Sequence, residues 1–418
     1  MKIKRLDIEG FRSLRKVSWE PGDLNVVIGP NGSGKSNLLQ FLELISVSAQ
    51  GRLGKYIQSL GGMDALVWDG QATSIRFGLD TEPSNVGLGL GHYELNLVRL
   101  GSRSSYILEN ELLTGKVQNK LLERDSKHSV IHCAYPINGN EEKSNVIVPV
   151  FVEDKSISNE ETLLHSAAGS FLIYDDISNF QQFLSSISIY QNFHSDKNAP
   201  IRQSTITRFE KRVESDGQNL ISVLHTLYTG DREFKADINA AMKAAFGDDF
   251  EELVFPPASD QRIQLRIRWK SLKREQSAAH LSDGTLRFLF LLTVLASPDP
   301  PPVIAIDEPE TGLHPSMLPI IAEFAQDAAM RSQVIFTTHS PQFLDAMTEA
   351  KPTTTVALWE NGETILRTLP KDELEYWLKG YSLGALFRSG TLEQISNSHF
   401  GMTNVPNVGW ARRTHREP

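Results

Sequence analysis

The sequence predicts an α/β fold with a mainly parallel core sheet, an antiparallel β subdomain and an inserted helical lobe. Short apolar runs at Leu24–Ile28, Val303–Ile306 and Val334–Thr337 are bounded by chain breakers, which is typical of strands buried in a parallel sheet. Strict alternation of apolar and polar residues between positions 75 and 97 indicates an antiparallel meander. Helical spacing in the middle of the chain predicts the additional lobe.

The composition limits the class of protein before any motif is considered. The chain has 418 residues, of which 40% are hydrophobic and 22% charged, enough for a sizeable core and more than one lobe. A net charge of −9 argues against a generally basic nucleic-acid binder but leaves a local basic patch open. Cys133 is the one cysteine, which excludes an internal disulfide framework and a cysteine-rich zinc site.

The sequence contains no signal for secretion or for membrane insertion. The charged start Met1–Arg5 leads into a strand-like stretch without an apolar segment, and the longest apolar run, Phe288–Ala296, is too short to span a bilayer. We therefore expect a cytoplasmic protein that has no membrane partner.

Residues 1–155 are expected to form the N-terminal part of the main lobe. Leu6 and Ile8 alternate with polar residues, and the strand Leu24–Ile28 leads into a glycine-rich loop and a helix over Asn37–Ile45. The meander follows, with its apolar positions at Ile75, Phe77, Leu79, Tyr93, Leu95 and Leu97.

Residues 156–258 are expected to form the inserted lobe, with helices at His165–Phe183 and Asn219–Tyr228. Residues 259–418 complete the main lobe. They contain alternation over Gln261–Lys270, a helix over Met317–Met330 between the two buried strands, and a hairpin of Val356–Leu358 and Ile365–Leu369 that turns at Asn361-Gly362. The main lobe is therefore split in sequence, without internal repeats or heptads.

The loop after the first buried strand matches the phosphate-binding pattern G-x-x-x-x-G-K-[ST]; it consists of Gly29, Pro30, Asn31, Gly32, Ser33, Gly34, Lys35 and Ser36. Its backbone N–H groups would converge on the phosphates of ATP at the positive end of the following helix. We expect Lys35 to reach the β- and γ-phosphates, Ser36 to ligate Mg²⁺, and Asn37 to join the nucleotide contacts. The alternative, an accidental glycine-rich turn, does not explain why a strand precedes it and a helix follows.

Asp307 and Glu308 end the second buried strand, on the sheet edge where ligands bind in parallel sheets. Asp307 would hold the Mg²⁺ shell, and Glu308 would polarise the water that attacks the γ-phosphate. His339 ends the next strand and would sense that phosphate or help to hold the water. The alternatives are an ordinary Asp-Glu-Pro turn and a satisfied turn histidine.

These motifs, together with Leu281–Thr285, occur in the order that resembles ABC-type ATPases, where LSDGT matches the signature usually written LSGGQ. The resemblance covers roughly residues 1–100 and 260–345 and implies a P-loop NTPase fold with an ABC-type head. Ile8–Leu14 is similar to the SMC/RecF branch. Asp307–Pro315 and Tyr381–Gly390 are similar to OLD-type and related bacterial "AAA family" ATPases.

The resemblance implies a head-to-head homodimer, closed by ATP, in which the signature of one subunit caps the γ-phosphate held by the other. It assigns Ser282 and the Gly284 backbone to the partner's nucleotide, and Thr311–His314 to the D-loop at the same interface. It places Arg12 and Ser13 near the nucleotide. The signature departs from the family at two positions: it has Asp283 where glycine is usual and Thr285 where glutamine is usual. The family's Q-loop glutamine is not identified, and Gln71 and Gln191 are both candidates.

Missing motifs narrow the subfamily. No heptads, no Cys-x-x-Cys and, after His339, no D-x-D are found, so we expect no coiled-coil arm, zinc hook or Toprim nuclease. The apolar stretch Phe288–Leu292 differs from the basic-alanine helix that follows the signature in transporter ATPases. The resemblance thus implies a stand-alone ATPase, of a bacterial group often encoded beside an effector, such as a nuclease or toxin, in phage defence. The alternatives are a nucleotide-gated scaffold with little hydrolysis and, more remotely, a transporter ATPase.

A strand over residues 261–270 would place four basic side chains on one face: Arg262, Arg266, Arg268 and Lys270. This face is either a solvated outer surface or a contact surface for the DNA backbone.

Overall fold

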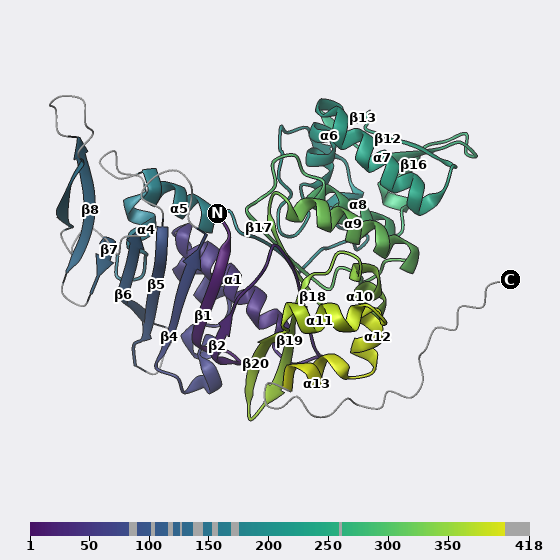
Figure 1. Cartoon of the computed structure of the whole chain (residues 1–418). Helices are drawn as coiled ribbons and strands as arrows, with labels where there is room; N and C mark the ends of the chain where they lie inside the picture. Colours follow the sequence, from purple (N-terminus) through teal and green to yellow (C-terminus); the bar gives the residue numbers. More distant parts are fainter. Residues whose placement is uncertain are drawn as a thin grey trace.

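The computed structural model describes residues 1–82, 90–101, 105–115, 120–125, 128–136, 145–152, 158–168, 175–258 and 261–397. An antiparallel sheet lies at one end of the molecule, a mixed sheet at its centre, and helices with small sheets lie at the other end (Figure 1). Within the described residues no helix is both long and apolar enough to cross a membrane. The longest described helices have 15 residues each, so this part of the chain holds no coiled-coil arm.

The central sheet confirms the predicted, mainly parallel core. Its six strands follow the order β10 (Ser188–Tyr190), β17 (Val303–Asp307), β18 (Gln333–Thr338), β3 (Leu24–Ile28), β19 (Thr353–Glu360) and β20 (Glu363–Thr368). All neighbouring pairs are parallel except the β19–β20 hairpin. The register pairs Asp307 with Thr337 and Thr338 with Ile28, so the three strand ends that precede the predicted motifs share one edge.

The antiparallel sheet is larger than the predicted meander. Its eight strands follow the order β2 (Leu14–Trp19), β1 (Ile3–Phe11), β4 (Ser74–Thr81), β5 (Leu90–Arg99), β6 (Tyr106–Gly115), β7 (Lys120–Arg124), β8 (Ser129–Pro136) and β9 (Asn145–Val152). Helix α1 (Lys35–Ala49) packs against it through a chain of aromatic rings from Phe11 through Phe41 and Phe77 to Tyr93, with centroids 5.0–5.8 Å apart. This apolar contact fixes the helix that begins at the phosphate loop.

The remaining elements lie around the two sheets. Near α1 are α2 (Leu53–Ser59), α3 (Met63–Leu66), η1 (Trp68–Gly70), α4 (Leu163–Ala167) and α5 (Asp175–Ser185). The helical lobe contains η2 (Pro200–Arg202), α6 (Leu220–Gly230), α7 (Arg232–Phe246), η3 (Ala278–His280), α8 (Asp283–Leu295), η4 (Pro315–Met317) and α9 (Leu318–Ala329). The C-terminal helices are α10 (Pro341–Met347), α11 (Lys371–Leu378), α12 (Leu383–Arg388) and α13 (Thr391–Asn397).

Two small sheets correct the predicted strand over Gln261–Lys270. Its first part is β14 (Arg262–Ile263) and its second part is β15 (Arg266–Trp269), and these strands belong to different three-stranded sheets. The partners are β11 (Thr205–Ile206) and β13 (Pro257–Ala258) in one sheet, and β12 (Phe250–Val254) and β16 (Gln276–Ser277) in the other. Between the strands, the N–H of Gln264 donates to Pro256 O, so the alternating pattern continues across a change of partner.

The middle segment also differs from its prediction. The helix expected over His165–Phe183 consists of α4 and α5, and residues 169–174 between them lie outside the described residues. Both helices pack into the hydrophobic cluster formed by α1 and the antiparallel sheet, whereas α6 packs with α8 and the central sheet in a second cluster. The first part of the segment, up to β10, is therefore part of the structure around α1.

Candidate nucleotide-binding site

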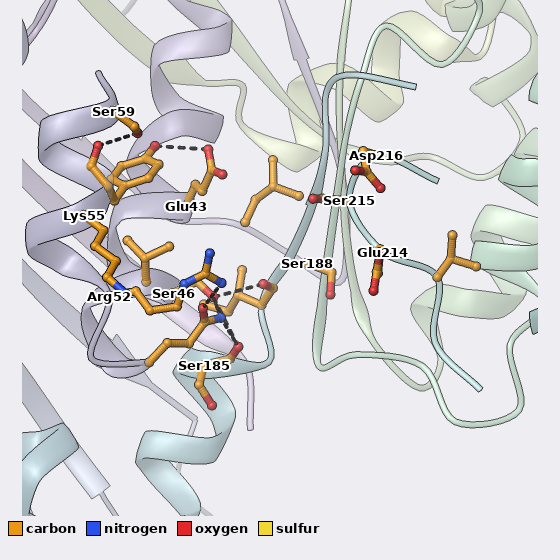
Figure 2. Close-up of a pocket in the computed structure, with 16 residues that line it drawn as sticks. Glu43, Ser46, Arg52, Lys55, Ser59, Ser185, Ser188, Glu214, Ser215 and Asp216 are labelled. Carbon is orange, nitrogen blue, oxygen red and sulfur yellow. Dashed lines mark hydrogen bonds between the residues drawn. The ribbon is translucent and has the colours of Figure 1, made fainter. Parts of the chain in front are cut away.

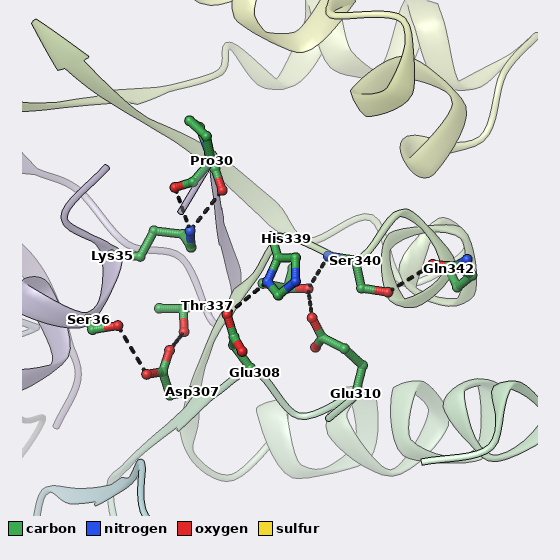
Figure 3. Close-up of polar contacts among 12 residues, drawn as sticks. Pro30, Lys35, Ser36, Asp307, Glu308, Glu310, Thr337, His339, Ser340 and Gln342 are labelled. Carbon is green, nitrogen blue, oxygen red and sulfur yellow. Dashed lines mark hydrogen bonds and ion pairs between the residues drawn. The ribbon is translucent and has the colours of Figure 1, made fainter. Parts of the chain in front are cut away.

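The phosphate loop joins β3 to α1, as its sequence requires. Gly34 is the N-cap of α1 and has φ of 95°, a left-handed conformation that glycine adopts without strain. The ammonium of Lys35 donates to the carbonyl oxygens of Gly29 at 2.7 Å and Pro30 at 3.0 Å (Figure 3). Burial lowers the pKa of Lys35, and nearby carboxylates, Glu308 foremost, oppose that shift. The loop thus holds its own cation on its backbone, at the place where phosphate oxygens would take over these contacts.

Two predicted nucleotide residues lie beside the loop in a hydrogen-bonded brace. The amide of Asn37 donates to the Ser13 hydroxyl at 2.7 Å, and that hydroxyl is hydrogen-bonded to Thr364 at 2.7 Å. Thr364, which is buried, donates in turn to Ser33 O in the loop at 2.9 Å. Sequence reasoning missed Thr364, because its one local signal, a position just after the Asn361-Gly362 turn, says nothing about what the strand approaches.

Arg12 lies in the same β1–β2 turn, with φ of 46°. Its N–H donates to Leu66 O at 2.7 Å and its guanidinium donates to Gln40 Oε1 on α1 at 2.6 Å. Arg12, which the sequence analysis placed near the nucleotide, thus joins the β1–β2 turn to the side of α1 in this structure.

The acidic strand end meets the phosphate loop directly. The Ser36 hydroxyl donates to Asp307 Oδ2 at 3.1 Å, and the Thr337 hydroxyl donates to the other carboxylate oxygen (Figure 3). A hydroxyl and a carboxylate are the hard oxygen donors that Mg²⁺ takes. These two residues therefore fit the ion, which would neutralise phosphate charge when bound.

Glu308 and His339 form a second pair at this edge. Glu308 Oε1 lies 2.8 Å from His339 Nδ1, and both side chains are more than a third exposed, at 36% and 44%. The Glu308 backbone has φ of 44°, a strained conformation for a residue with a side chain. The β17–β18 register brings the two predicted catalytic side chains together on the open side of the loop.

Two further charged residues, which the sequence did not reveal, hold this edge. Arg287 on α8 donates to Glu308 O at 2.8 Å and to Asp307 O at 3.4 Å, and burial lowers its pKa. Glu310 accepts from the Thr338 hydroxyl at 2.6 Å, and burial raises its pKa. In the sequence, nothing distinguishes this arginine and this glutamate from charged residues on a solvated surface.

The signature stretch forms the start of α8. Ser282 is the N-cap and accepts from the Thr285 N–H at 3.1 Å. A Cβ on Gly284 would lie 2.5 Å from the carbonyl oxygen of Gly312, within the predicted D-loop, so a side chain does not fit there. Among the described residues, no hydrogen bond joins residues 281–285 to the phosphate loop of the same head.

The structure separates the two candidates for the Q-loop glutamine. Gln191 directly follows β10, whose Tyr190 pairs with Ile306, so Gln191 lies level with Asp307 at the functional edge. Its amide nitrogen is buried without a hydrogen-bond partner among the described residues. Gln71 is exposed and follows η1, so Gln191 is the candidate that the fold brings to the site.

The basic residues predicted on one face of residues 262–270 are distributed over two sheets. Arg262 donates to Ser204 O at 3.1 Å, while Lys270 is exposed. Arg266 and Arg268 form ion pairs with Glu275 at 3.7 and 2.8 Å, and Arg268 also pairs with Glu252. Carboxylates thus neutralise the two central arginines.

A cavity of about 660 Å³ lies along the second half of α1, away from the phosphate loop (Figure 2). Glu43 accepts from Tyr56 on one side of it at 3.0 Å, and burial raises the Glu43 pKa. Arg52 and Lys55 lie on the α1–α2 side, and acidic Glu214 and Asp216 on the other. Its mixed charge and its distance along the helix set it apart from the nucleotide site.

Comparison with known proteins agrees with this geometry. Residues 24–345 match the family model described as "AAA domain, putative AbiEii toxin, Type IV TA system". The "DNA replication and repair protein RecF" of Teredinibacter turnerae is 49% identical over 51 residues, 12% of this chain and 13% of that protein. The "Hemin import ATP-binding protein HmuV" of Myxococcus xanthus is 32% identical over 89 residues, 21% of this chain and 32% of that protein. Both alignments thus span at most a third of the relative's own length.

Solved structures share the fold over nearly the whole chain. An SMC head bound to the C-terminal winged-helix domain of ScpA has a TM-score of 0.55 at 13% identity, covering 90% of this chain and 100% of that one. A Pyrococcus furiosus Smc head domain with an extended coiled coil, bound to the C-terminal domain of ScpA, has a TM-score of 0.50 at 13% identity, covering 90% and 98%. The chain therefore belongs to the matched AAA-domain family and has the α/β fold of an SMC head.

Proposed function

We propose that the protein is an ATP-hydrolysing switch, in which ATP closes two heads against each other and hydrolysis reopens them. The observation that carries this proposal is the 2.8 Å contact between Glu308 and His339, directly beyond the Ser36–Asp307 hydrogen bond. A carboxylate at this position, next to the place of the γ-phosphate, supports a hydrolytic rather than a purely binding site.

The side chains divide the chemistry between them. Lys35 leaves the loop carbonyls and stabilises charge on the β- and γ-phosphates, while Ser36 and Asp307 hold Mg²⁺. Glu308 orients and polarises the attacking water, and His339 holds the Glu308 carboxylate in place through its Nδ1. Arg287 fixes the main chain of Glu308, so that the carboxylate points from a defined backbone position.

In the proposed dimer, the signature of one head contacts the nucleotide that is bound by the other head. Support comes from Ser282 and Gly284, which, among the residues that the structure describes, have no hydrogen bond to their own phosphate loop, and Ser282 caps the start of α8. A helix N-terminus offers backbone N–H groups and a positive dipole end to a phosphate. Two copies of this chain would therefore complete both sites.

We further propose that the switch controls a partner effector protein. The description of the matched family names a putative AbiEii toxin and a type IV TA system, which supports a task linked to a toxin. In our proposal that task involves a toxin or nuclease encoded nearby and serves bacterial phage defence. The switch would work in the cytoplasm, where ATP is supplied. A DNA contact gains no support from the basic residues 262–270, since Arg266 and Arg268 are paired with carboxylates.

Glu308→Gln tests the catalytic assignment. Loss of the carboxylate should slow single-turnover phosphate release by a factor of about 10² or more and let an ATP-bound dimer accumulate. Phosphate release and light scattering measure the two effects. Glu323→Gln, which changes an exposed carboxylate on α9, is the matched control.

Normal hydrolysis by Glu308→Gln would show that another group activates the water. Very slow phosphate release by the unchanged protein, with normal ATP-driven dimerisation, would favour the nucleotide-gated scaffold. Affinity purification with the protein encoded by the neighbouring gene, with and without ATP, tests the effector; equal recovery in both conditions would contradict nucleotide control.

A further inference from the structure

The signature carries an acid, Asp283, that is paired with a residue of the distant middle segment. Its partner is Arg202, at the end of η2 and 81 residues earlier in the chain. The Asp283 side chain is 71% exposed, whereas that of Arg202 is only 9% exposed. The contact is thus a buried guanidinium that reaches outward to the first residue of α8.

All three guanidinium nitrogens of Arg202 donate hydrogen bonds close to the start of α8. Its Nε donates to Ser195 O at 2.7 Å, and one terminal nitrogen donates to Leu281 O at 2.7 Å and Ala278 O at 3.2 Å. The other terminal nitrogen pairs with Asp283. A planar guanidinium makes such divergent contacts in a fixed geometry, which the single ammonium of lysine does not.

These contacts enclose the signature tip. Leu281 precedes the N-cap Ser282, and Asp283 follows it, so Arg202 holds the chain on both sides of the cap. Gly312 O lies so close to Gly284 that an added Cβ would meet it at 2.5 Å. The hydrogen bonds that fix the chain on both sides of Ser282 therefore come from Arg202, which lies outside the signature.

We propose that Arg202 is a positioning residue that presents Ser282 and Gly284 to the nucleotide of the partner head. This inference rests on the proposed ATP-driven dimer. Arg202 has no hydrogen bond to the phosphate loop of its own head among the described residues, so its loss should spare ATP binding by a single head and impair dimer closure.

The test compares dimerisation with single-head binding in the Glu308→Gln background. Arg202→Ala should raise the ATP concentration for half-maximal dimerisation by about tenfold or more, since several charge-assisted hydrogen bonds are lost. Affinity for a fluorescent ATP analogue, measured at head concentrations below dimerisation, should stay within about twofold of the parent. Arg212→Ala is the matched control, because Arg212 forms an exposed ion pair with Asp299 in the same lobe.

Arg202→Lys keeps the charge and most of the buried side chain, so it carries the test if Arg202→Ala does not fold. It should also shift dimerisation upward without changing single-head affinity, because one ammonium cannot replace the fork. Folded variants that dimerise at the parental ATP concentration would overturn the role of Arg202 alone. A Glu308→Gln parent that never dimerises with ATP would overturn the proposed function, and this inference with it.

Discussion

The phosphate loop and the signature tip are both short, glycine-containing stretches at helix N-termini, but they are held differently. The phosphate loop satisfies its own cation, because Lys35 donates to Gly29 and Pro30 only a few residues away. The signature tip is held by Arg202, which comes from a distant part of the chain. The phosphate loop also accepts one distant hydrogen bond, from Thr364 to Ser33 O. The cation of the phosphate loop is thus held by local backbone contacts, whereas the start of α8 is held by a tertiary contact.

The largest expected effect concerns Lys35, the locally held cation of the phosphate loop. Lys35→Ala should weaken ATP binding by at least about 30-fold or abolish it, because the loop loses the ammonium that is expected to contact the β- and γ-phosphates. Isothermal titration with ATP and Mg²⁺ measures the loss, and Lys16→Ala in the exposed face of β2 is the control. Tight binding by Lys35→Ala would mean that the loop backbone alone suffices.

Ser282→Arg tests the role of the signature tip. It should leave ATP binding by one head intact but block ATP-driven dimerisation and hydrolysis, since the large side chain would occupy the tip that meets the second head in the proposed dimer. Nucleotide titration and light scattering on the same samples separate the two effects. Dimerisation that survives would show that residues 281–285 act only as a helix start.

Gly284→Ala should produce a smaller effect, mainly on stability. The added Cβ would meet Gly312 O at 2.5 Å, so the tip and the D-loop must move apart, at a cost of about 1–3 kcal/mol. Denaturant unfolding measures this cost. Gly380→Ala is the matched control, because a Cβ there meets no atom within 4 Å. Equal stability of the two variants would contradict the tight tip–D-loop contact.

The smallest expected effect concerns the pH dependence of Glu310. Burial raises its pKa in the folded state, so the folded protein holds its proton more tightly than the unfolded chain. Unfolding free energy should therefore fall as pH rises from the unfolded pKa through the folded one, and this cost vanishes below both values. Glu310→Gln should gain stability over the unchanged protein at neutral pH and lose that advantage in acid. A constant difference between pH 3 and 8 would contradict this linkage.

Much of the nucleotide edge could be predicted because each motif comes directly after a strand. The runs before Gly29, Asp307 and His339 identify parallel strands, and parallel strands end on one edge. The sequence could not choose between Gln71 and Gln191, because β10 is a short strand whose place beside β17 depends on tertiary pairing.

The prediction over Gln261–Lys270 failed for a related reason. Alternation reports which side chains are buried, but it does not report which strand pairs with which. The chain keeps its alternation while it passes from the β14 sheet to the β15 sheet. The ion pairs that neutralise Arg266 and Arg268 come from residues whose proximity follows only from this pairing.

The sequence by itself determined the α/β class, the phosphate loop and the carboxylates and histidine at the strand ends, since these follow from local periodicity and chain order. Only the tertiary structure decided that Arg287 holds Glu308, that Thr364 braces the loop and that Arg202 holds the signature. Such contacts join residues far apart in the chain. Their hydrogen-bonding capacity is visible in the sequence, but their partners depend on how whole elements pack.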